Sequence, residues 1–203
     1  QGTDRLHQIV NSMLDVARLE NQVLSPKLAP LSITPILRLI HKGYQEELDT
    51  RDINLIYEDS VYSPPLTLID PELIKKALDN LIVNAIKFTP DGGSVTVSIA
   101  PAEDDKLGPC AELCIKDTGI GIDPDNLDII FEKLYQLGEV DFHSSGRTTF
   151  KGGGPGLGLA IASGIIKAHG GRVWAESPGY DEENCPGSTF FVRLKTPENA
   201  TTT

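Results

Sequence analysis

The stretch DPELIKKALDNLIVNAIKFTP, residues 70–90, decides how the rest of the chain is organised. Asp70 is a good N-cap residue, Pro71 suits the first helical position, and Glu72 favours the positive end of a helix dipole. Apolar side chains then recur at helical spacing. They are Leu73, Ile74, Ala77, Leu78, Leu81 and Ile82. The stretch therefore predicts a helix with one buried side that begins after Asp70 and ends near Phe88.

A polar stripe follows the other side of the same helix. Asn80, Asn84 and Lys87 stand four and three residues apart, so they share one helix face. A carboxamide oxygen can coordinate Mg²⁺ without adding charge, and a lysine pairs with a phosphate as a point charge. Taken alone, the stripe fits either a solvated helix face or a site for a phosphate and a divalent cation.

Alternating apolar and polar residues on both sides of this helix predict a sheet. The expected strands are 53–57, 66–69, 94–100, 112–116, 173–176 and 189–194. The last four of these segments read as two hairpins, because turn-forming residues separate the members of each pair. We therefore expect an α+β fold in which one mixed sheet carries helices on one face.

Other helices are expected on both sides of the central one. Residues 35–48 form a second amphipathic pattern, with Ser32 or Thr34 as its N-cap, and residues 156–169 form a third. Residues 5–20, RLHQIVNSMLDVARLE, carry an apolar stripe that a lone helix of this length needs to bury against a partner. Proline-containing residues 25–30 read as a linker or a short edge strand.

The composition limits the classes of partner. With 203 residues, of which 39% are apolar, the chain suits one domain of ordinary size and an appendage. The formal net charge of -11 argues against non-specific nucleic-acid binding and against contact with an anionic membrane surface, since both need excess Lys and Arg. Such an acidic chain must bind an anionic ligand locally, through backbone N–H groups, a few cations and a metal ion.

The same features predict the cellular setting and the domain bounds. The three cysteines lack a metal-ligand pattern, which favours reduced thiols in a cytoplasmic setting. No apolar run reaches the roughly 18–20 residues that span a bilayer. The chain opens at Gln1 inside a helical pattern, so we expect it to belong to a longer protein, with any membrane anchor outside this sequence. The expected bounds are 1–24 for a helix, 25–198 for one domain and 199–203 for a disordered tail.

A second candidate segment, Asp117-Thr118-Gly119-Ile120-Gly121, follows the strand at 112–116. A carboxylate at a strand end can accept a hydrogen bond from an exocyclic amine, and the glycines let the backbone approach a flat base. Two other readings remain. Asp-x-Gly is common in plain turns, and Asp-Thr-Gly also occurs in aspartic proteases, where two such carboxylates share a proton. This chain has one such motif, so a protease would need a homodimer.

Two further segments are candidates for a functional site. Residues 152–159, GGGPGLGL, enter a helix, where unpaired N–H groups can meet an anion. No Gly-Lys-Ser/Thr follows, and a loop rather than a strand precedes, so neither a Walker loop nor a dinucleotide fingerprint fits. Residues 130–136, IFEKLYQ, read as a hydrophobic anchor for the Gly-, Ser- and Thr-rich residues 138–153, which are too many for a mere connection.

In this order, the segments resemble the N, G1, F and G2 boxes of sensor histidine kinases. Those kinases belong to the Bergerat-fold (GHKL) superfamily, with gyrase B, Hsp90 and MutL. The likeness covers roughly residues 28–195. It extends to residues 87–90, 169–171, 174–177 and 187–190. Each box is modestly specific, but four in order are highly specific. The resemblance implies a two-layer α/β sandwich preceded by a long helix.

The resemblance also implies that the chain binds ATP with Mg²⁺. Asn84 would coordinate the metal ion, and Asp117 would bind the adenine amino group. The residues implied to contact the nucleotide are Asn80, Asn84, Lys87, Asp117, Gly119, Gly121, Ile122, Gly154, Gly156, Leu157, Gly158 and Thr189. Residues 138–153 would be a lid over ATP, in which Arg147 and Lys151 are the cations that could reach the γ-phosphate. The groups implied in catalysis are Asn80, Lys87, Arg147 and Lys151.

One position separates kinases from hydrolases within the superfamily. The hydrolysing relatives place a glutamate four residues before the metal-binding Asn, where it serves as general base for water. Asn80 occupies that position here and cannot take a proton from water. The resemblance therefore favours phosphoryl transfer to another nucleophile over hydrolysis of ATP.

In the resembled kinases, the nucleophile is a histidine on the first helix of a dimeric helical hairpin, directly followed by an acidic residue. None of His7, His41, His143 and His169 fits that pattern, so we expect the acceptor outside this sequence. Residues 5–20 resemble the second helix of the hairpin, which makes His7 a helix-surface residue. The implied partners are a response regulator receiver domain and, through the hairpin, a second copy of the full-length protein.

Two other classes of function stay open at this point. The chain could be an ATP-binding regulator, such as a degenerate kinase or an anti-sigma-type kinase that acts on Ser. It could also be an interaction domain that kept the fold without binding a nucleotide. The hairpin-like helix argues against the anti-sigma type, and the intact N, G1 and G2 residues argue against the interaction domain.

Overall fold

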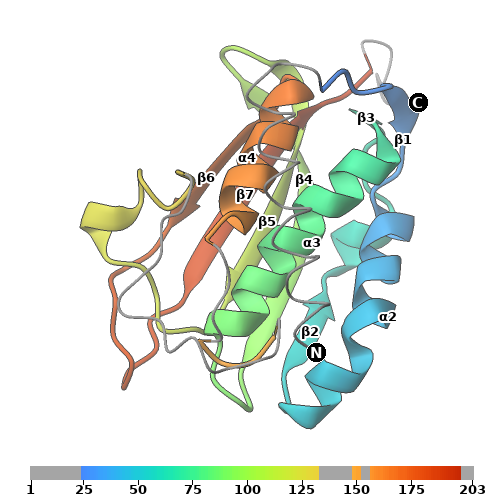
Figure 1. The fold of residues 1–203 in the computed structure, drawn as a ribbon. Helices are drawn as coiled ribbons and strands as arrows, with labels where there is room; N and C mark the ends of the chain where they lie inside the picture. The colour runs from blue at the N-terminus through green and yellow to red at the C-terminus, as the bar shows by residue number, and fades with distance from the viewer. Residues whose placement is uncertain (1–23, 133–147, 152–155, 198–203) are drawn as a thin grey trace.

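A computed structural model of the chain describes residues 24–132, 148–151 and 156–197. These residues form two layers, with a five-stranded sheet covered on one face by the helices α2, α3 and α4 (Figure 1). Strand β2 runs parallel to β4, and the other neighbouring pairs are antiparallel. The predicted α+β sandwich with a mixed sheet is therefore confirmed.

The main sheet contains both predicted hairpins. In spatial order its strands are β2 (Asn54–Tyr57), β4 (Ser94–Asp104), β5 (Gly108–Asp117), β7 (Ser188–Lys195) and β6 (Arg172–Glu176). Thr96 lies opposite Lys116 in the first hairpin, and Val173 lies opposite Val192 in the second. The strands β4 and β5 continue several residues past the predicted ends, because their pairing extends to Asp104 and Gly108 at the hairpin turn.

The expectation of a single sheet is wrong. The strand expected at 66–69 is β3 (Thr67–Ile69), which pairs with β1 (Ala29–Leu31) in a separate two-stranded sheet. Alternation shows that a segment is extended but does not show which strand it pairs with. Pro30 lies in β1, as expected for a short edge strand in which the missing N–H group is tolerated.

The helices agree with the predictions except at their ends. They are α2 (Thr34–Thr50), α3 (Pro71–Phe88) and α4 (Gly158–Ala168). The predicted caps of α2 are wrong, because the N-cap is Ile33 and makes no side-chain cap bond. The Thr34 hydroxyl instead donates to the Val61 carbonyl oxygen. Helix α4 begins two residues later than predicted because Gly156 has a φ of 66°, which is not helical.

The N-terminal end of α3 is fixed by specific contacts. The Asp70 carboxylate accepts the N–H groups of Glu72 and Leu73 at 3.2 Å, which confirms the predicted N-cap. The Asp70 N–H donates to Nε2 of His169 at 3.1 Å, while Nδ1 of His169 lies 2.8 Å from the Ile165 carbonyl oxygen. His169 therefore joins the C-terminal end of α4 to the start of α3.

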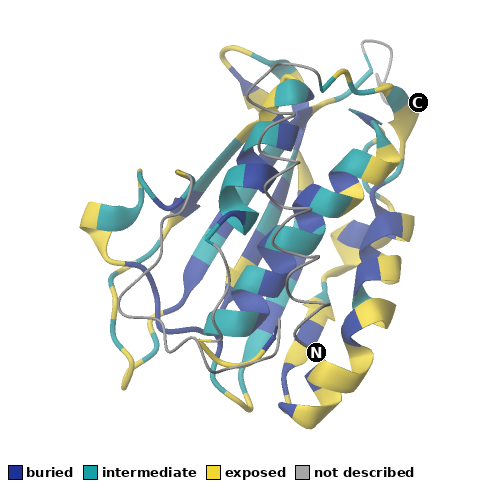
Figure 2. Cartoon of the chain, in the orientation of Figure 1, coloured by how far each residue is buried: buried dark blue, intermediate teal, exposed yellow. Residues whose placement is uncertain are grey.

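The hydrophobic core lies between the helices and the sheet. Figure 2 shows the buried residues of α3 and α4 on the sides that meet each other and the strands. Leu78, Leu81 and Ile82 of α3 are fully buried, as predicted. Ile130 is also buried, and Phe131 packs edge-on against Phe190 with ring centroids 6.3 Å apart.

Some expectations lie outside the described residues. They concern the helix at 5–20, the tail at 199–203 and most of the lid at 138–153. Within the described ranges, no helix is long and apolar enough to cross a bilayer. The three cysteines are free thiols.

Candidate nucleotide-binding site

Strand β5 ends at Asp117, whose carboxylate is buried. The residue is 2% exposed. Its Oδ1 accepts the N–H groups of Gly119 at 2.8 Å and Ser188 at 3.1 Å, and its Oδ2 accepts the Ser188 hydroxyl at 2.6 Å. A carboxylate has about four lone-pair sites. Asp117 is therefore oriented by the protein and can still accept one further hydrogen bond on Oδ2.

The loop after Asp117 packs against the end of α3. The Ile120 N–H donates to the Phe88 carbonyl oxygen at 3.1 Å. A Cβ atom on Gly119 would lie 2.4 Å from that same oxygen and 2.7 Å from Oδ1 of Asp117, so only glycine fits here. Phe88 stands four residues after Asn84, which is about 6 Å along the helix axis. The fold thus places the buried carboxylate near the polar stripe of α3.

The polar stripe also meets the start of α4. Asn80, Asn84 and Lys87 are half-buried, whereas the residues between them on the opposite side are buried. A Cβ atom on Gly158 would lie 3.2 Å from Oδ1 of Asn80. The N-cap of α4, Leu157, provides no side-chain cap bond. The first N–H groups of α4 therefore lie beside the asparagine stripe, where an anion can accept them.

The pKa values of two charged groups in the site are shifted. Burial raises the pKa of Asp117, while the hydrogen bonds from Ser188 and Gly119 oppose that rise. Burial also lowers the pKa of Lys87, whose Nζ lies 4.8 Å from the centroid of the Phe88 ring. A carboxylate and an ammonium that have lost much of their hydration gain more from a matching polar partner than exposed groups do.

The residues 148–151 lie at the same end of α3. The Lys151 N–H donates to the Lys87 carbonyl oxygen at 3.0 Å. The Lys151 ammonium forms an ion pair with Glu182, on the connection between β6 and β7. Because the side chains of both Lys151 and Glu182 are exposed, this ion pair contributes little to the stability of the fold. The backbone of Lys151 thus lies beside that of Lys87, while its charge is directed at Glu182.

The remaining predicted residues lie in different surroundings. Gly121 has a φ of 74° and pairs with Tyr180 as an isolated bridge. The side chains of Ile122 and Leu157 belong to the hydrophobic core, so they could meet a ligand only through their backbone. Thr189 is half-buried on β7. Gly156 precedes α4, whereas Gly154, Arg147 and His143 lie outside the described residues.

The sequence reasoning missed Ser188. This residue, rather than Thr189, provides both the N–H and the hydroxyl that hold Asp117. The signal was a hydroxyl residue at the start of a strand, directly after Gly187. Its meaning depends on the antiparallel register that places Ser188 opposite Asp117, and a single sequence does not give that register.

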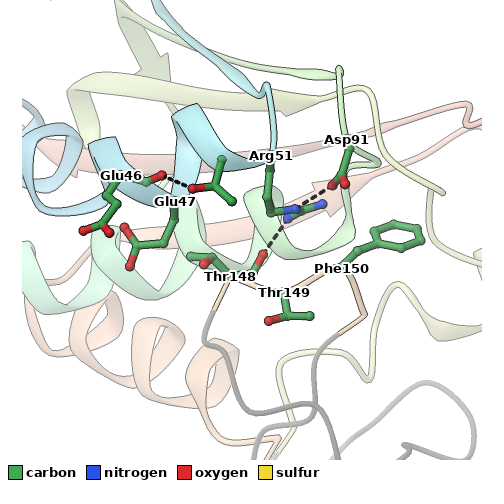
Figure 3. A pocket seen from close by; sticks show the side chains of 8 residues that line it. Glu46, Glu47, Arg51, Asp91, Thr148, Thr149 and Phe150 are labelled. Atoms are coloured by element: carbon green, nitrogen blue, oxygen red, sulfur yellow. Dashed lines mark hydrogen bonds and ion pairs between the residues drawn. The ribbon is translucent and has the colours of Figure 1, made fainter.

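An open pocket of about 540 Å³ lies between the C-terminal end of α2 and residues 148–150 (Figure 3). The residues that line it are Glu46, Glu47, Thr50, Arg51, Asp91, Thr148, Thr149 and Phe150. Neither Asp117 nor the asparagine stripe contributes to its walls. Three of its eight lining residues are acidic, so this pocket is unsuited to a polyphosphate.

The metal-binding capacity of the site rests on neutral oxygens. In residues 24–132, 148–151 and 156–197, no group of three or more His, Cys, Asp or Glu side chains could hold a metal ion. Mg²⁺ commonly keeps several waters and is held by a few protein groups together with substrate phosphates. The carboxamides of Asn84 and Asn80 fit that role, because they add oxygen ligands beside the α4 N-terminus without adding charge.

Residues 69–198 match the family described as histidine kinase-, DNA gyrase B- and HSP90-like ATPases. Among curated proteins, the chain is 32% identical over 177 residues to the sensor histidine kinase WalK of Bacillus subtilis, covering 86% of this chain and 27% of WalK. It is 30% identical over 194 residues to the sensor protein SrrB of Staphylococcus aureus, covering 96% of this chain and 30% of SrrB. The chain thus spans less than a third of these relatives.

Solved structures with the same fold include histidine kinases. Full-length ShkA, in complex with AMPPNP, matches with a TM-score of 0.74 and 28% identity, over 96% of this chain and 37% of ShkA. Histidine kinase ThkA, in complex with the response regulator TrrA, matches with a TM-score of 0.66 and 22% identity, over 98% of this chain and 49% of that protein. The second likeness shows the fold alone.

Proposed function

Because the chain belongs to the family of histidine kinase-, DNA gyrase B- and HSP90-like ATPases, we propose that it binds ATP with Mg²⁺ and is the catalytic part of a sensor histidine kinase. The proposal is carried by one observation: the buried Asp117 carboxylate is held beside the end of α3, whose asparagine stripe meets the start of α4. The chain is also similar to WalK and SrrB, which are a sensor histidine kinase and a sensor protein.

In the proposed complex, the chain binds the two ends of the nucleotide with different groups. Asp117 accepts a hydrogen bond from the exocyclic amine of adenine on its free lone pair. The N–H groups at the start of α4 and the cations Lys87 and Lys151 receive the phosphates. Lys151 must leave Glu182 to do so. Asn84 would hold Mg²⁺, which would supply neutralisation of part of the triphosphate charge.

Kinase chemistry is favoured over hydrolysis by Asn80. This neutral side chain donates its amide N–H to the Lys76 carbonyl oxygen at 3.1 Å and turns its oxygen toward Gly158. It therefore has no basic group to activate water. In the proposed reaction, an imidazole nitrogen bonds to the γ-phosphorus in line with the breaking bond to the β,γ-bridging oxygen, and ADP leaves. The protein contributes positioning and charge neutralisation.

The acceptor imidazole is proposed to lie outside the described residues and outside this sequence. His169 is buried with both ring nitrogens engaged by Asp70 and Ile165, and His41 lies against the Tyr57 ring. We propose that the transferred phosphoryl group passes on to a response regulator receiver domain. The full-length protein is proposed to act as a homodimer in the cytoplasm, with no nucleic-acid partner and no membrane contact by this part.

Asn84→Ala is expected to remove the magnesium-dependent part of ATP binding. In calorimetric titrations with Mg²⁺, affinity should fall about tenfold, the effect of losing one strong polar contact. In EDTA the variant should match the parent chain. Lys75→Ala, on an exposed part of the same helix, is the control and should leave both titrations unchanged. An equal loss with and without Mg²⁺ would remove Asn84 from the metal site.

The chain is expected to bind labelled ATP without acquiring acid-labile phosphate itself. When it is mixed with the helical hairpin of a related kinase that carries a phosphoacceptor histidine, label should appear on the hairpin. A hairpin in which that histidine is replaced by alanine is the control. Acid-labile label on the chain alone would refute the missing acceptor, and release of inorganic phosphate without transfer would favour an ATPase.

A further inference from the structure

Arg51, at the C-terminal end of α2, connects three segments that are far apart in the sequence. Its Nη1 donates to the carbonyl oxygens of Ile86 at 2.8 Å and Thr148 at 2.5 Å, and its Nη2 donates to the carbonyl oxygen of Thr89 at 2.6 Å. Its Nε donates to Oδ1 of Asp91 at 2.8 Å. Figure 3 shows the guanidinium directed toward Thr148 and Asp91.

The surroundings of Arg51 are unusual for a charged residue. Its side chain is 10% exposed, while the carboxylate with which it pairs, that of Asp91, is 70% exposed. A buried charge is costly unless hydrogen bonds satisfy it. Here backbone carbonyls do so, two of them at the C-terminal end of α3, where the helix dipole favours a cation. The guanidinium fork allows one side chain to reach all three carbonyls.

Among the described residues, two hydrogen bonds hold Thr148–Lys151 against the end of α2 and the end of α3. One passes through Arg51 to the carbonyl of Thr148, and the other joins the Lys151 N–H to the Lys87 carbonyl oxygen. The Arg51 guanidinium also lies 5.9 Å from the centroid of the Phe150 ring. Thr148 itself is 5% exposed. Arg51 thus holds the first residue of this segment and the Lys87 carbonyl oxygen holds the last.

We propose that Arg51 is a positioning residue that fixes Thr148–Lys151 on the C-terminal end of α3, and thereby places Lys151 beside Lys87 for the nucleotide phosphates. The second half of this statement rests on the proposed ATP site. The first half concerns the protein without nucleotide and can be tested separately. Arg51 contacts no reacting atom, and it acts through the segment that it holds.

Limited trypsin digestion without nucleotide tests the anchor. In Arg51→Met, which keeps an apolar stem but removes every donor, cleavage after Lys151 should be about tenfold faster than in the parent chain. Arg51→Lys keeps the charge but lacks the fork, so its rate should fall between the two. Mass spectrometry identifies the cleaved bond, and thermal melting reports the global stability of each variant.

Arg193→Met is the matched control. Arg193 makes ion pairs with Asp104 at 2.9 Å and Glu112 at 2.7 Å, at the end of β7 away from Ser188, and touches no residue of 148–151. Its loss should lower the melting temperature without speeding cleavage after Lys151. If Arg51→Met speeds that cleavage no more than Arg193→Met at equal loss of stability, Arg51 is only structural and the proposal is overturned.

ATP titrations then test the link to the site. Arg51→Met and Lys151→Met should each weaken ATP binding, and the double variant should bind no more weakly than the weaker-binding of the two single variants. Additive losses would show that Arg51 does not act through Lys151. A parent chain that binds no ATP would refute the proposed function, whereas the digestion would still decide whether Arg51 anchors the segment.

Discussion

Asp117→Asn is expected to weaken ATP binding by roughly 10- to 100-fold, the effect of losing a charge-assisted hydrogen bond of about 1.5–3 kcal/mol. The carboxylate is held by Gly119 and Ser188 so that Oδ2 keeps a free lone pair. Asparagine has only one side-chain oxygen to accept these hydrogen bonds. Its NH₂ group would then face either the N–H groups of Gly119 and Ser188 or the adenine amine, all of which are donors. Isothermal titration of both chains with ATP measures the change.

The matched control is Asp104→Asn. Asp104 is also a buried carboxylate, 4% exposed, and it accepts Arg193 and Arg172 at 2.9 Å and 2.8 Å. It lies at the far end of β4, where the hairpin turns toward β5. Its substitution should destabilise the fold and leave ATP affinity unchanged once the folded fraction is corrected for. Unchanged affinity in Asp117→Asn would instead remove Asp117 from the adenine pocket.

Gly121→Ala is expected to destabilise the protein by about 3 kcal/mol, combining a left-handed backbone with a steric clash. Gly121 has a φ of 74°, and a Cβ atom there would lie 1.9 Å from the Gly179 carbonyl oxygen. Because Gly179 belongs to the connection between β6 and β7, backbone must move on one side or the other. The midpoint of urea unfolding measures the loss.

Gly43→Ala is the control for a glycine that the fold does not need. It lies at an exposed position inside α2, with open space around the added Cβ atom. Alanine there should stabilise the protein by up to about 1 kcal/mol through helix propensity. If Gly121→Ala unfolds at the same urea concentration as the parent chain, the loop after Asp117 does not require glycine, and its close packing on residue 179 is refuted.

Local patterns were enough to predict most of the fold. The Asp70-Pro71 start, the apolar side of α3 and the two hairpins depend on neighbours within a few residues, so the sequence alone carries them. The partner of β3 could not be predicted, since three extended residues fit the edge of either sheet. The cap of α2 was mispredicted because the Thr34 hydroxyl donates to Val61, which is 27 residues away in the sequence.

The residues of the candidate site also fall into those that the sequence predicts and those that depend on long-range contacts. Asp117, Asn84 and the glycines at the start of α4 are predicted as site residues because the order of four motifs along the chain carries the resemblance. Ser188 and Arg51 were missed because their roles depend on long-range pairing, with Ser188 acting 71 residues and Arg51 up to 97 residues away. An arginine at the end of an amphipathic helix otherwise reads as an ordinary solvated cation.

The hydrogen bond from the N–H of Asp70 to His169 fixes the C-terminal end of α4 to the start of α3. The eleven residues of α4 span about 16 Å. A tilt of the helix by about 10° around His169 would therefore move Gly158 by about 3 Å relative to Asn80. The C-terminal end of α4, beside His169, would hardly move. Such a tilt would therefore change the gap between α3 and α4 most where the phosphates are proposed to lie.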